Sequence, residues 1–169
     1  MEMLAENIEK IYTIEEYPAM DDASVEKHEF YNGKVVKLSG AKPTHNIIDA
    51  NIITELVLGT QNKPKEYFVL TSDSKIYNPR YNSSLYPDAV VICEAIELYP
   101  GSSTVITNPF LIVEVLSSST EQHDRTGKFY YYKMLPGFKE YVLVWQTIPS
   151  VTASYKIGDR TWKDKDATG

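Results

Sequence analysis

The segment Phe110–Leu116 is apolar throughout except for Glu114. Strands that face water on one side alternate apolar and polar residues, whereas a run this apolar is normally covered on both faces. Side chains alternate between the two faces of a strand, so Glu114 shares its face with Ile112 and Leu116. The run therefore predicts a buried strand inside a sheet, with other elements packed on both of its sides.

Three segments have helical patterns. Thr13 with Glu16 three residues later has the form of a capping box, which predicts a helix near the beginning of the chain. Apolar residues then recur at helical spacing between a predicted cap at Thr44 and a predicted stop at Gly59. A third helical pattern runs over about residues 117–135. We expect these helices to flank the sheet.

Strand patterns fill most of the remaining chain. Asn32-Gly33 stands between two short strand-like runs, which is typical of a β-hairpin. Segments 78–86 and 100–109 are rich in turn-forming residues and predict loops. We expect a mixed α/β or α+β domain with a central mixed β-sheet flanked by helices. Its further strands are predicted at residues 67–71, 75–77, 88–93, 110–116 and 140–145, with a final hairpin at 152–157 and 161–162.

Length and charge limit the classes of protein. The 169 residues fit a single domain, residues 1–169. The net charge of −6 opposes non-specific binding to nucleic acid or anionic membrane, but it is compatible with a nucleic-acid enzyme that has a local basic groove. The single cysteine, Cys93, excludes an internal disulfide framework and a cysteine-based zinc site. No apolar run approaches ~20 residues and the first residues lack a basic region, so we expect no membrane span, no secretory signal and a cytoplasmic location.

Asp88 and Glu114 are carboxylates where a strand disfavours charge. Charge at a buried strand position costs several kcal/mol unless a cation or hydrogen-bond donors compensate it. Adjacent strands lie about 4.8 Å apart, so inward carboxylates on neighbouring strands would share one hard cation such as Mg²⁺. The alternatives are a strand-start aspartate at Asp88 and, for Glu114, a buried ion pair or a strand end exposed to water.

Lys128 is the cation predicted to lie near these acids. Asp124, Lys128 and Tyr132 follow one another at intervals of four, so they share one face of the expected helix. The aromatic residues that follow Lys128 would pack that helix on the sheet. The alternative is an ordinary surface pair between Asp124 and Lys128, which contributes only tenths of a kcal/mol, about 0.3–0.5.

Taken in order, these motifs resemble the Uma-type restriction endonuclease family of the PD-(D/E)XK nuclease superfamily. The resemblance covers about Tyr12 to Trp145 and implies a restriction-endonuclease-like core. Pro-Asp or Glu-X-X alone is a weak signature, whereas the ordered series at these spacings is far more specific. The series consists of Glu29-Phe30-Tyr31-Asn32-Gly33, His45, Pro87-Asp88, residues 109–117, residues 124–128, Tyr132 and residues 137–141.

The resemblance implies metal-dependent hydrolysis of phosphodiester bonds in DNA, with Mg²⁺ or Mn²⁺ as the ion. Asp88, Glu114 and the backbone carbonyl of Val115 would hold the ion. Lys128 would orient the attacking water or stabilise the charge that develops on phosphorus. Glu29 matches the early acidic position of the family and is a further expected catalytic residue. A homodimer is compatible with the resemblance.

Leu116 departs from the superfamily pattern, which has a lysine two residues after the acid. The resemblance suggests a migrated lysine, with Lys128 reaching the site from the following helix. His45 is a weaker candidate, because a histidine at a helix start is more often a hydrogen-bonding structural residue. His28 and His123 have no metal-ligand spacing with it, so a histidine-based zinc site is not expected.

Leu116 also motivates an alternative of another class. A nuclease fold that has lost its catalytic lysine would be an inactive module that binds nucleic acid or a protein partner. A third interpretation is a metallohydrolase that uses the same carboxylates on a small molecule; a deep closed pocket without a basic groove would favour it.

Overall fold

The structure is a computed structural model that describes residues 10–117 and 121–169. Six strands form its larger sheet, in the order β11-β10-β9-β8-β6-β3. β8 is the predicted apolar strand, and it pairs antiparallel with β6 on one side and parallel with β9 on the other. The strands are β3 (Tyr67–Thr71), β6 (Ala89–Cys93), β8 (Leu111–Leu116), β9 (Glu140–Trp145), β10 (Ser150–Lys156) and β11 (Trp162–Thr168).

A second, smaller sheet has the order β2-β1-β5-β4-β7. Like the larger sheet, the smaller sheet is mixed: β7 runs parallel to β4, whereas the other neighbouring strands of the sheet pair antiparallel. This sheet was not expected from the sequence as a separate layer. Its strands are β1 (His28–Tyr31), β2 (Lys34–Lys37), β4 (Lys75–Asn78), β5 (Ser83–Leu85) and β7 (Val105–Ile106).

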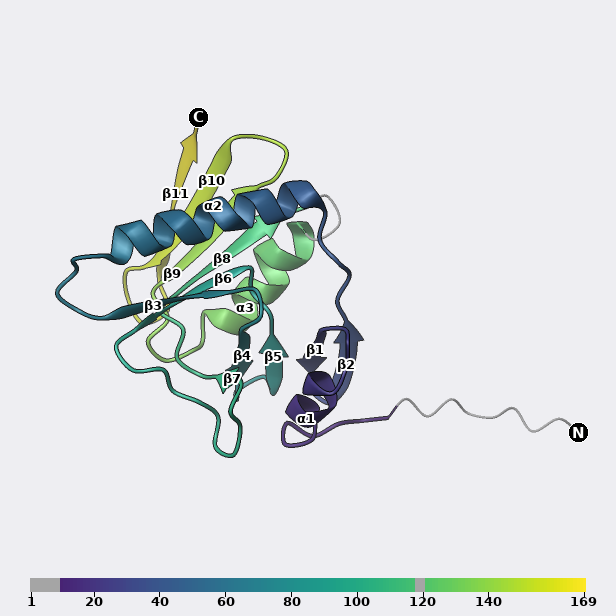
Figure 1. Ribbon diagram of the computed structural model, residues 1–169. Helices are drawn as coiled ribbons and strands as arrows, with labels where there is room; N and C mark the ends of the chain where they lie inside the picture. Colours follow the sequence, from purple (N-terminus) through teal and green to yellow (C-terminus); the bar gives the residue numbers. More distant parts are fainter. Residues whose placement is uncertain (1–9, 118–120) are drawn as a thin grey trace, which may run out of the picture.

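Helices cover both faces of the larger sheet, which confirms the predicted fold class. The long helix α2 (Pro43–Thr60) crosses one face, and the π-helix η1 (His123–Lys128) continues into α3 (Phe129–Tyr132) on the other (Figure 1). The short helix α1 (Tyr17–Asp22) lies beside β1 and β2. Within residues 10–117 and 121–169, no helix combines the length and apolarity that crossing a membrane requires.

Two local predictions near the beginning of the chain are confirmed. The Thr13 amide donates to Glu16 Oε2 at 3.0 Å and the Glu16 amide donates to Thr13 Oγ1 at 3.3 Å, so the capping box forms ahead of α1. Asn32 and Gly33 join β1 to β2 with φ angles of 46° and 94°. Both angles lie in the left-handed region that this tight turn requires.

Other predicted boundaries were wrong. Helix α2 begins at Pro43 rather than after a Thr44 cap, because proline fits the first turn of a helix, where its missing amide is not needed. Gly59 lies inside α2 and does not end it. The predicted loops 78–86 and 100–109 contain β5 and β7, short strands that pair only because the smaller sheet assembles around them.

Candidate active site

Lys128 lies at the centre of a buried group of acidic side chains. Its side chain is 9% exposed, and its Nζ atom lies 3.1 Å from Glu114 Oε2 and 3.4 Å from Glu29 Oε1. The same Nζ donates to the carbonyl of Tyr86 at 3.1 Å, and Asp124 Oδ1 is 3.7 Å away. We call Glu29, Glu114 and Lys128 the inner cluster. The structure thus brings together three of the four predicted catalytic residues.

Each member of the inner cluster comes from a different layer. Glu114 is on β8 of the larger sheet, Glu29 is on β1 of the smaller sheet, and Lys128 is at the end of η1. The two oxygens of Glu29 are held separately, since Oε1 accepts from the Tyr86 amide at 3.1 Å and Oε2 from the Tyr31 hydroxyl at 2.6 Å. The inner cluster therefore joins both sheets to the helical layer.

Burial and charge act on the inner cluster in opposite directions. Burial of Glu114, whose exposed fraction is 2%, raises the pKa of its carboxyl well above the usual value, and the Lys128 ammonium only partly offsets this. Burial alone would lower the pKa of Lys128, but the charges of Glu114, Glu29 and Asp124 outweigh burial and raise it. Lys128 is therefore held as a cation in a site that excludes most water.

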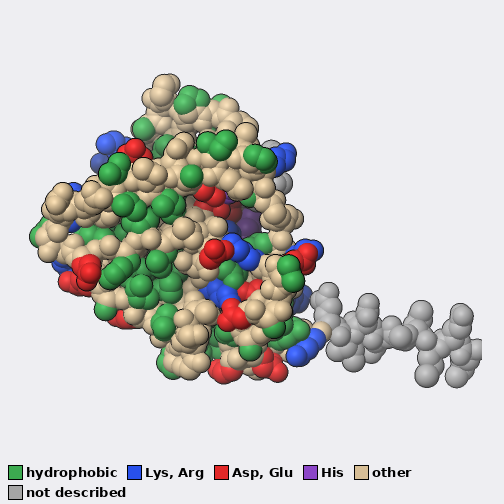
Figure 2. All heavy atoms as spheres, viewed as in Figure 1, with side chains coloured by type: hydrophobic (Ala, Val, Ile, Leu, Met, Phe, Trp, Pro, Cys, Tyr) green, Lys and Arg blue, Asp and Glu red, His purple; other side chains and the backbone are tan. Residues whose placement is uncertain are grey.

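A second group of polar side chains forms where α2 meets the start of β6. His45 Nε2 lies 3.2 Å from Asp88 Oδ1 and 3.3 Å from Asp49 Oδ2. One ligand atom from each of these residues lies within 4.8 Å of the others. We call His45, Asp49 and Asp88 the outer cluster. In Figure 2, histidine and acidic side chains are visible in a hollow below α2.

Hydrogen bonds that the imidazole donates to Asp49 and Asp88 raise the pKa of His45 to about 10, although partial burial acts against its charge. The imidazole is therefore cationic at neutral pH and balances the two carboxylates. It must release its proton before it can act as a metal ligand.

One backbone amide links the two clusters. The amide of Val115 donates to Asp88 Oδ2 at 2.6 Å, and Val115 directly follows Glu114 on β8. The charge of Asp88 also acts on both Glu114 and Lys128. Asp88, the fourth predicted catalytic residue, thus lies next to the inner cluster. Its Oδ1 atom pairs with His45, whereas its Oδ2 atom accepts from the amide of Val115.

Each cluster has one buried carboxylate oxygen that is open to a ligand. Within the described part of the chain, Glu114 Oε1 and Asp49 Oδ1 are buried without a hydrogen-bond partner. Carboxylate oxygens are the ligands that Mg²⁺ and Mn²⁺ prefer, and Mn²⁺ also accepts imidazole. The ligand set Asp88, Glu114 and Val115 stays a prediction, and the structure adds His45 and Asp49 as candidate ligands.

The residue pattern did not single out Asp49, which lies on α2. The signal was present, because His45 and Asp49 are four residues apart and so neighbours on one helix face. Nothing in the sequence indicated that this face meets Asp88. Leu116 is buried in the apolar core, as its side chain requires, and Lys128 occupies the space near Glu114 instead.

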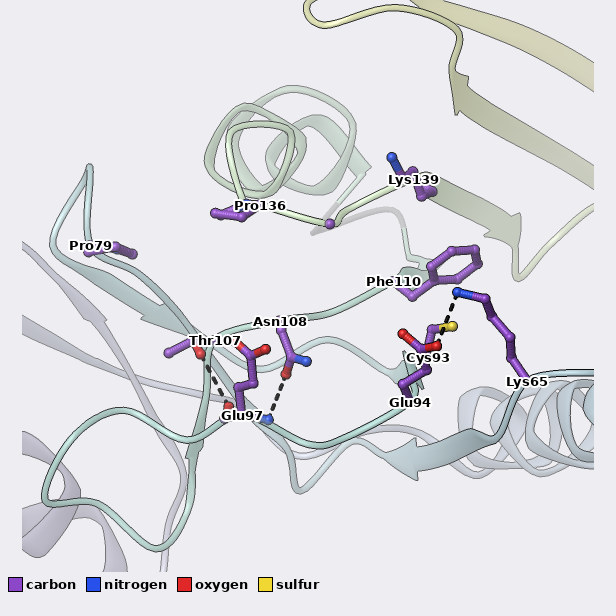
Figure 3. Close-up of a pocket in the computed structure, with 11 residues that line it drawn as sticks. Lys65, Pro79, Cys93, Glu94, Glu97, Thr107, Asn108, Phe110, Pro136 and Lys139 are labelled. Carbon is purple, nitrogen blue, oxygen red and sulfur yellow. Dashed lines mark hydrogen bonds and ion pairs between the residues drawn. The ribbon is translucent and has the colours of Figure 1, made fainter.

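A pocket of about 440 Å³ lies away from both clusters (Figure 3). Cys93, Phe110 and Lys139 line it, together with Glu94, which pairs with Lys65 at 3.2 Å. Cys93 ends β6, whereas Asp88 precedes β6, so the pocket lies at the opposite end of that strand. It contains no predicted site residue and gives no support to a small-molecule metallohydrolase.

Comparison with known proteins assigns the chain to a family. Residues 14–167 match the family Uma2, described as "Putative restriction endonuclease", and the chain belongs to this family. The resemblance expected from the sequence motifs is thereby confirmed.

Two relatives come from Synechocystis sp. (strain ATCC 27184 / PCC 6803 / Kazusa). The chain is 36% identical to "Uncharacterized protein sll1609" over 153 residues, 90% of this chain and 85% of the relative. It is 32% identical to "Uncharacterized protein slr1290" over 148 residues, 88% and 76% of the two chains.

A crystal structure described as a putative nuclease belonging to DUF820, from Anabaena variabilis ATCC 29413, has a similar fold. The TM-score is 0.68 at 14% sequence identity, and the match covers 90% of this chain and 83% of the other. At this identity the likeness concerns the fold alone.

Proposed function

We propose that this chain is a metal-dependent endonuclease that hydrolyses phosphodiester bonds in DNA. The observation that carries the proposal is the buried Lys128 ammonium, which lies between Glu29 and Glu114. The residue after Glu114 is Val115, whose backbone amide donates to Asp88. This arrangement combines a fixed cation with adjacent carboxylates that fit a divalent ion. Membership of the restriction endonuclease family supports the same class of reaction.

Within this proposal, Asp88 and Glu114 would hold the ion with the carbonyl of Val115, and His45 and Asp49 lie beside Asp88 as further candidate ligands. A bound divalent ion supplies polarisation of the scissile phosphate and a lowered pKa for a bound water. Lys128 stabilises the negative charge that develops on the phosphoryl oxygens, because its own charge is maintained by the surrounding carboxylates. Glu29 positions that ammonium and is itself oriented by Tyr31.

Leu116 favours a second candidate function. The lysine that the superfamily carries at this position is absent, and Lys128 is engaged by carboxylates in a way that also serves stability alone. The second candidate is therefore an inactive nuclease-fold module that binds nucleic acid or a protein partner.

Cleavage assays separate the two functions. The purified chain is incubated with supercoiled, linear and single-stranded DNA and with RNA, in Mg²⁺, in Mn²⁺ and in a chelator. We expect cleavage of DNA that requires the divalent ion. Lys128→Met and Asp88→Asn should each reduce the rate by about 10²-fold or more, since the first removes the cation that stabilises the phosphate and the second removes a proposed ligand of the ion.

Asp73→Asn is the matched control, because Asp73 is an exposed acid whose side chain is 81% accessible. It should cleave at the rate of the unaltered chain, while circular dichroism verifies that all three variants are folded. Absence of cleavage on every substrate in both ions would contradict the nuclease proposal and favour the inactive module. Undiminished cleavage by Lys128→Met would contradict the role given to Lys128.

A further inference from the structure

Three tyrosines gather on the surface where the β4–β5 turn meets α3. The ring centroid of Tyr81 lies 4.9 Å from that of Tyr130 and 5.4 Å from that of Tyr131. Tyr130 is 49% exposed, and the other two are half-buried. We call Tyr81, Tyr130 and Tyr131 the tyrosine patch. Rings that served only to fill a core would be covered, whereas these leave aromatic surface accessible.

The patch is joined to the inner cluster through one side chain. The Tyr31 ring packs edge-on against Tyr131, with ring centroids 5.7 Å apart, and the Tyr31 hydroxyl donates to Glu29 at 2.6 Å. Aromatic surface therefore extends from beside a predicted catalytic carboxylate to the outside of the molecule.

Two cations lie beside the patch, and the segments that build it contain no acids. The Lys133 Nζ atom lies 4.8 Å from the centre of the Tyr130 ring, and Arg80 adjoins Tyr81 and interacts with its hydroxyl. Segments 74–87 and 125–139 contain no aspartate or glutamate, although the whole chain has 23 acids among 169 residues. At that average, these segments together would hold about four acids if charge played no part. The patch is thus a locally basic, aromatic surface on an acidic protein.

Aromatic rings with adjacent cations and no acids are the features that bind single-stranded nucleic acid. Unpaired bases stack on the rings, and lysine or arginine contacts the backbone phosphates. In a duplex the faces of the bases are stacked inside the helix, so rings on a protein surface cannot reach them.

We propose that the tyrosine patch binds the unpaired bases of a single-stranded segment of nucleic acid, with Arg80 and Lys133 contacting its phosphates. This inference rests on the proposed function for its class of ligand and deepens it. The segment that binds the patch would pass Tyr31 on its way to the inner cluster. The preferred substrate would then carry a single strand, a flap or a melted region next to the bond that is cut.

Binding without cleavage tests the proposal. The full chain, in a chelator that removes divalent ions, is titrated into a fluorescently labelled oligothymidine strand and into a duplex of the same length, and anisotropy is recorded. We expect the single strand to bind at least about tenfold more tightly than the duplex. The double variant Tyr81→Ala/Tyr130→Ala should weaken binding of the single strand by about tenfold or more, because each stacked base contributes about 1–3 kcal/mol.

Tyr155→Ala is the matched control, because Tyr155 is a half-buried tyrosine on β10, outside the patch. It should bind like the unaltered chain, and thermal melting should verify that all variants fold. The logarithm of the binding constant should fall linearly with the logarithm of the salt concentration. Arg80→Gln and Lys133→Gln should each make this slope shallower by about 0.7 per lost phosphate contact.

Equal affinity for single strand and duplex, or unchanged binding by the double tyrosine variant, would overturn the proposal. If the chain gives either result but still cleaves DNA, the proposed function stands although the tyrosine-patch proposal fails. Tyrosine-dependent binding together with no cleavage in Mg²⁺ or Mn²⁺ would instead support the patch and contradict the nuclease.

Discussion

Lys128 and Glu114 show how one buried pair combines stability with a charge fit for chemistry. A buried ion pair contributes little net stability compared with apolar residues, because both charges lose water. Its members nevertheless depend on one another, since removal of either leaves the other uncompensated. In this chain the dependence is unequal, because Lys128 faces Glu29 and Asp124 as well as Glu114.

Substitutions at Lys128 and at Glu114 test this unequal dependence. Lys128→Met should lower the free energy of unfolding by about 3–5 kcal/mol at neutral pH, because it leaves buried carboxylates without their cation. Glu114→Gln should cost less, about 1–3 kcal/mol, since Lys128 keeps two other acids and the amide can still accept a hydrogen bond. Urea unfolding measures both values.

Lys37→Met provides the control, because Lys37 pairs with Glu26 on the surface. Its cost should stay within about 1 kcal/mol, as for other exposed pairs. A loss for Glu114→Gln that equals or exceeds the loss for Lys128→Met would refute the unequal dependence.

A second buried acid, Asp21, makes stability depend on pH. Burial favours its neutral form, but hydrogen bonds from Tyr86 and Lys75 outweigh burial and lower the pKa of Asp21 below its usual value. Lys75 Nζ lies 3.0 Å from Asp21 Oδ2, and the His28 amide donates to Oδ1 at 2.8 Å. The carboxylate therefore stabilises the fold only while it is ionised.

The sign of the pH dependence follows from this lowered pKa. As pH falls below about 4, the unfolded chain takes up a proton at Asp21 before the folded chain does, so stability declines toward and through the folded pKa. Asp21→Asn should reduce stability at neutral pH and make the acid decline shallower. Urea unfolding at a series of pH values measures the slope, with Asp73→Asn as an exposed control. An unchanged acid slope in Asp21→Asn would contradict the prediction.

At the scale of elements, α2 contains a residue that weakens it. Gly59 lies within the helix, and a Cβ atom added there would meet no other atom within 4 Å. Gly59→Ala should raise the free energy of unfolding by about 0.5–1 kcal/mol, because alanine loses less conformational freedom in a helix. Chemical denaturation measures the change.

Gly101→Ala is the matched comparison. A Cβ atom would also find open space there, but φ is +82°, which side chains other than glycine rarely adopt. We expect this variant to destabilise the fold by about 1 kcal/mol. A destabilising effect of Gly59→Ala would show that the glycine serves a purpose other than helix formation.

The π-helix η1 is an element that residue periodicity did not predict. Intervals of four from Asp124 to Lys128 and Tyr132 favour a regular α-helix, yet residues 123–128 adopt the wider π-turn. Asp124, Lys128 and Tyr132 are all buried despite this change, as the shared face had predicted. A Cβ atom at Gly127 would lie 2.9 Å from His123 Nδ1, so a larger residue there would force the His123 side chain to shift. Single-turn π-helices occur often at functional sites, which agrees with the position of Lys128.

At the scale of the whole molecule, the two sheets share a group of buried charges. Lys128 pairs with Glu29 of the smaller sheet and Glu114 of the larger sheet. One of the two apolar cores also spans both layers, since Ile76 and Leu85 of the smaller sheet belong to the same buried group as Ile112 of the larger one. We therefore expect the chain to unfold as one cooperative unit.

The two tryptophans allow a test of this cooperativity. Trp145 and Trp162 both lie in the larger sheet, so tryptophan fluorescence reports on that sheet, whereas far-ultraviolet circular dichroism reports on the whole chain. Urea transitions followed by the two signals should coincide in midpoint and steepness. Two separated transitions would mean that the smaller sheet unfolds on its own and that the chain is not a single domain.

Local interactions account for what could be predicted from the sequence. The capping box at Thr13 and the turn at Asn32-Gly33 depend on neighbours three residues apart or less. The apolar run of β8 reports its burial directly, because each apolar side chain carries its own cost of exposure, whereas α2 has no fully buried residue despite its periodicity. The short strands β5 and β7 were missed, since two or three residues lack a pattern and depend on partners distant in the chain.

The candidate site also has one part that residue patterns predicted and one part that they did not. Glu114 stood out in the sequence because a carboxylate inside an apolar strand needs compensation, and the compensating cation is the predicted Lys128. The contact between Asp88 and His45 on α2, 43 residues apart, and the placement of Glu29 against Lys128 follow from the packing of helices on two sheets. Residue patterns record which side chains need partners, whereas the choice among distant partners depends on the close packing of the whole fold.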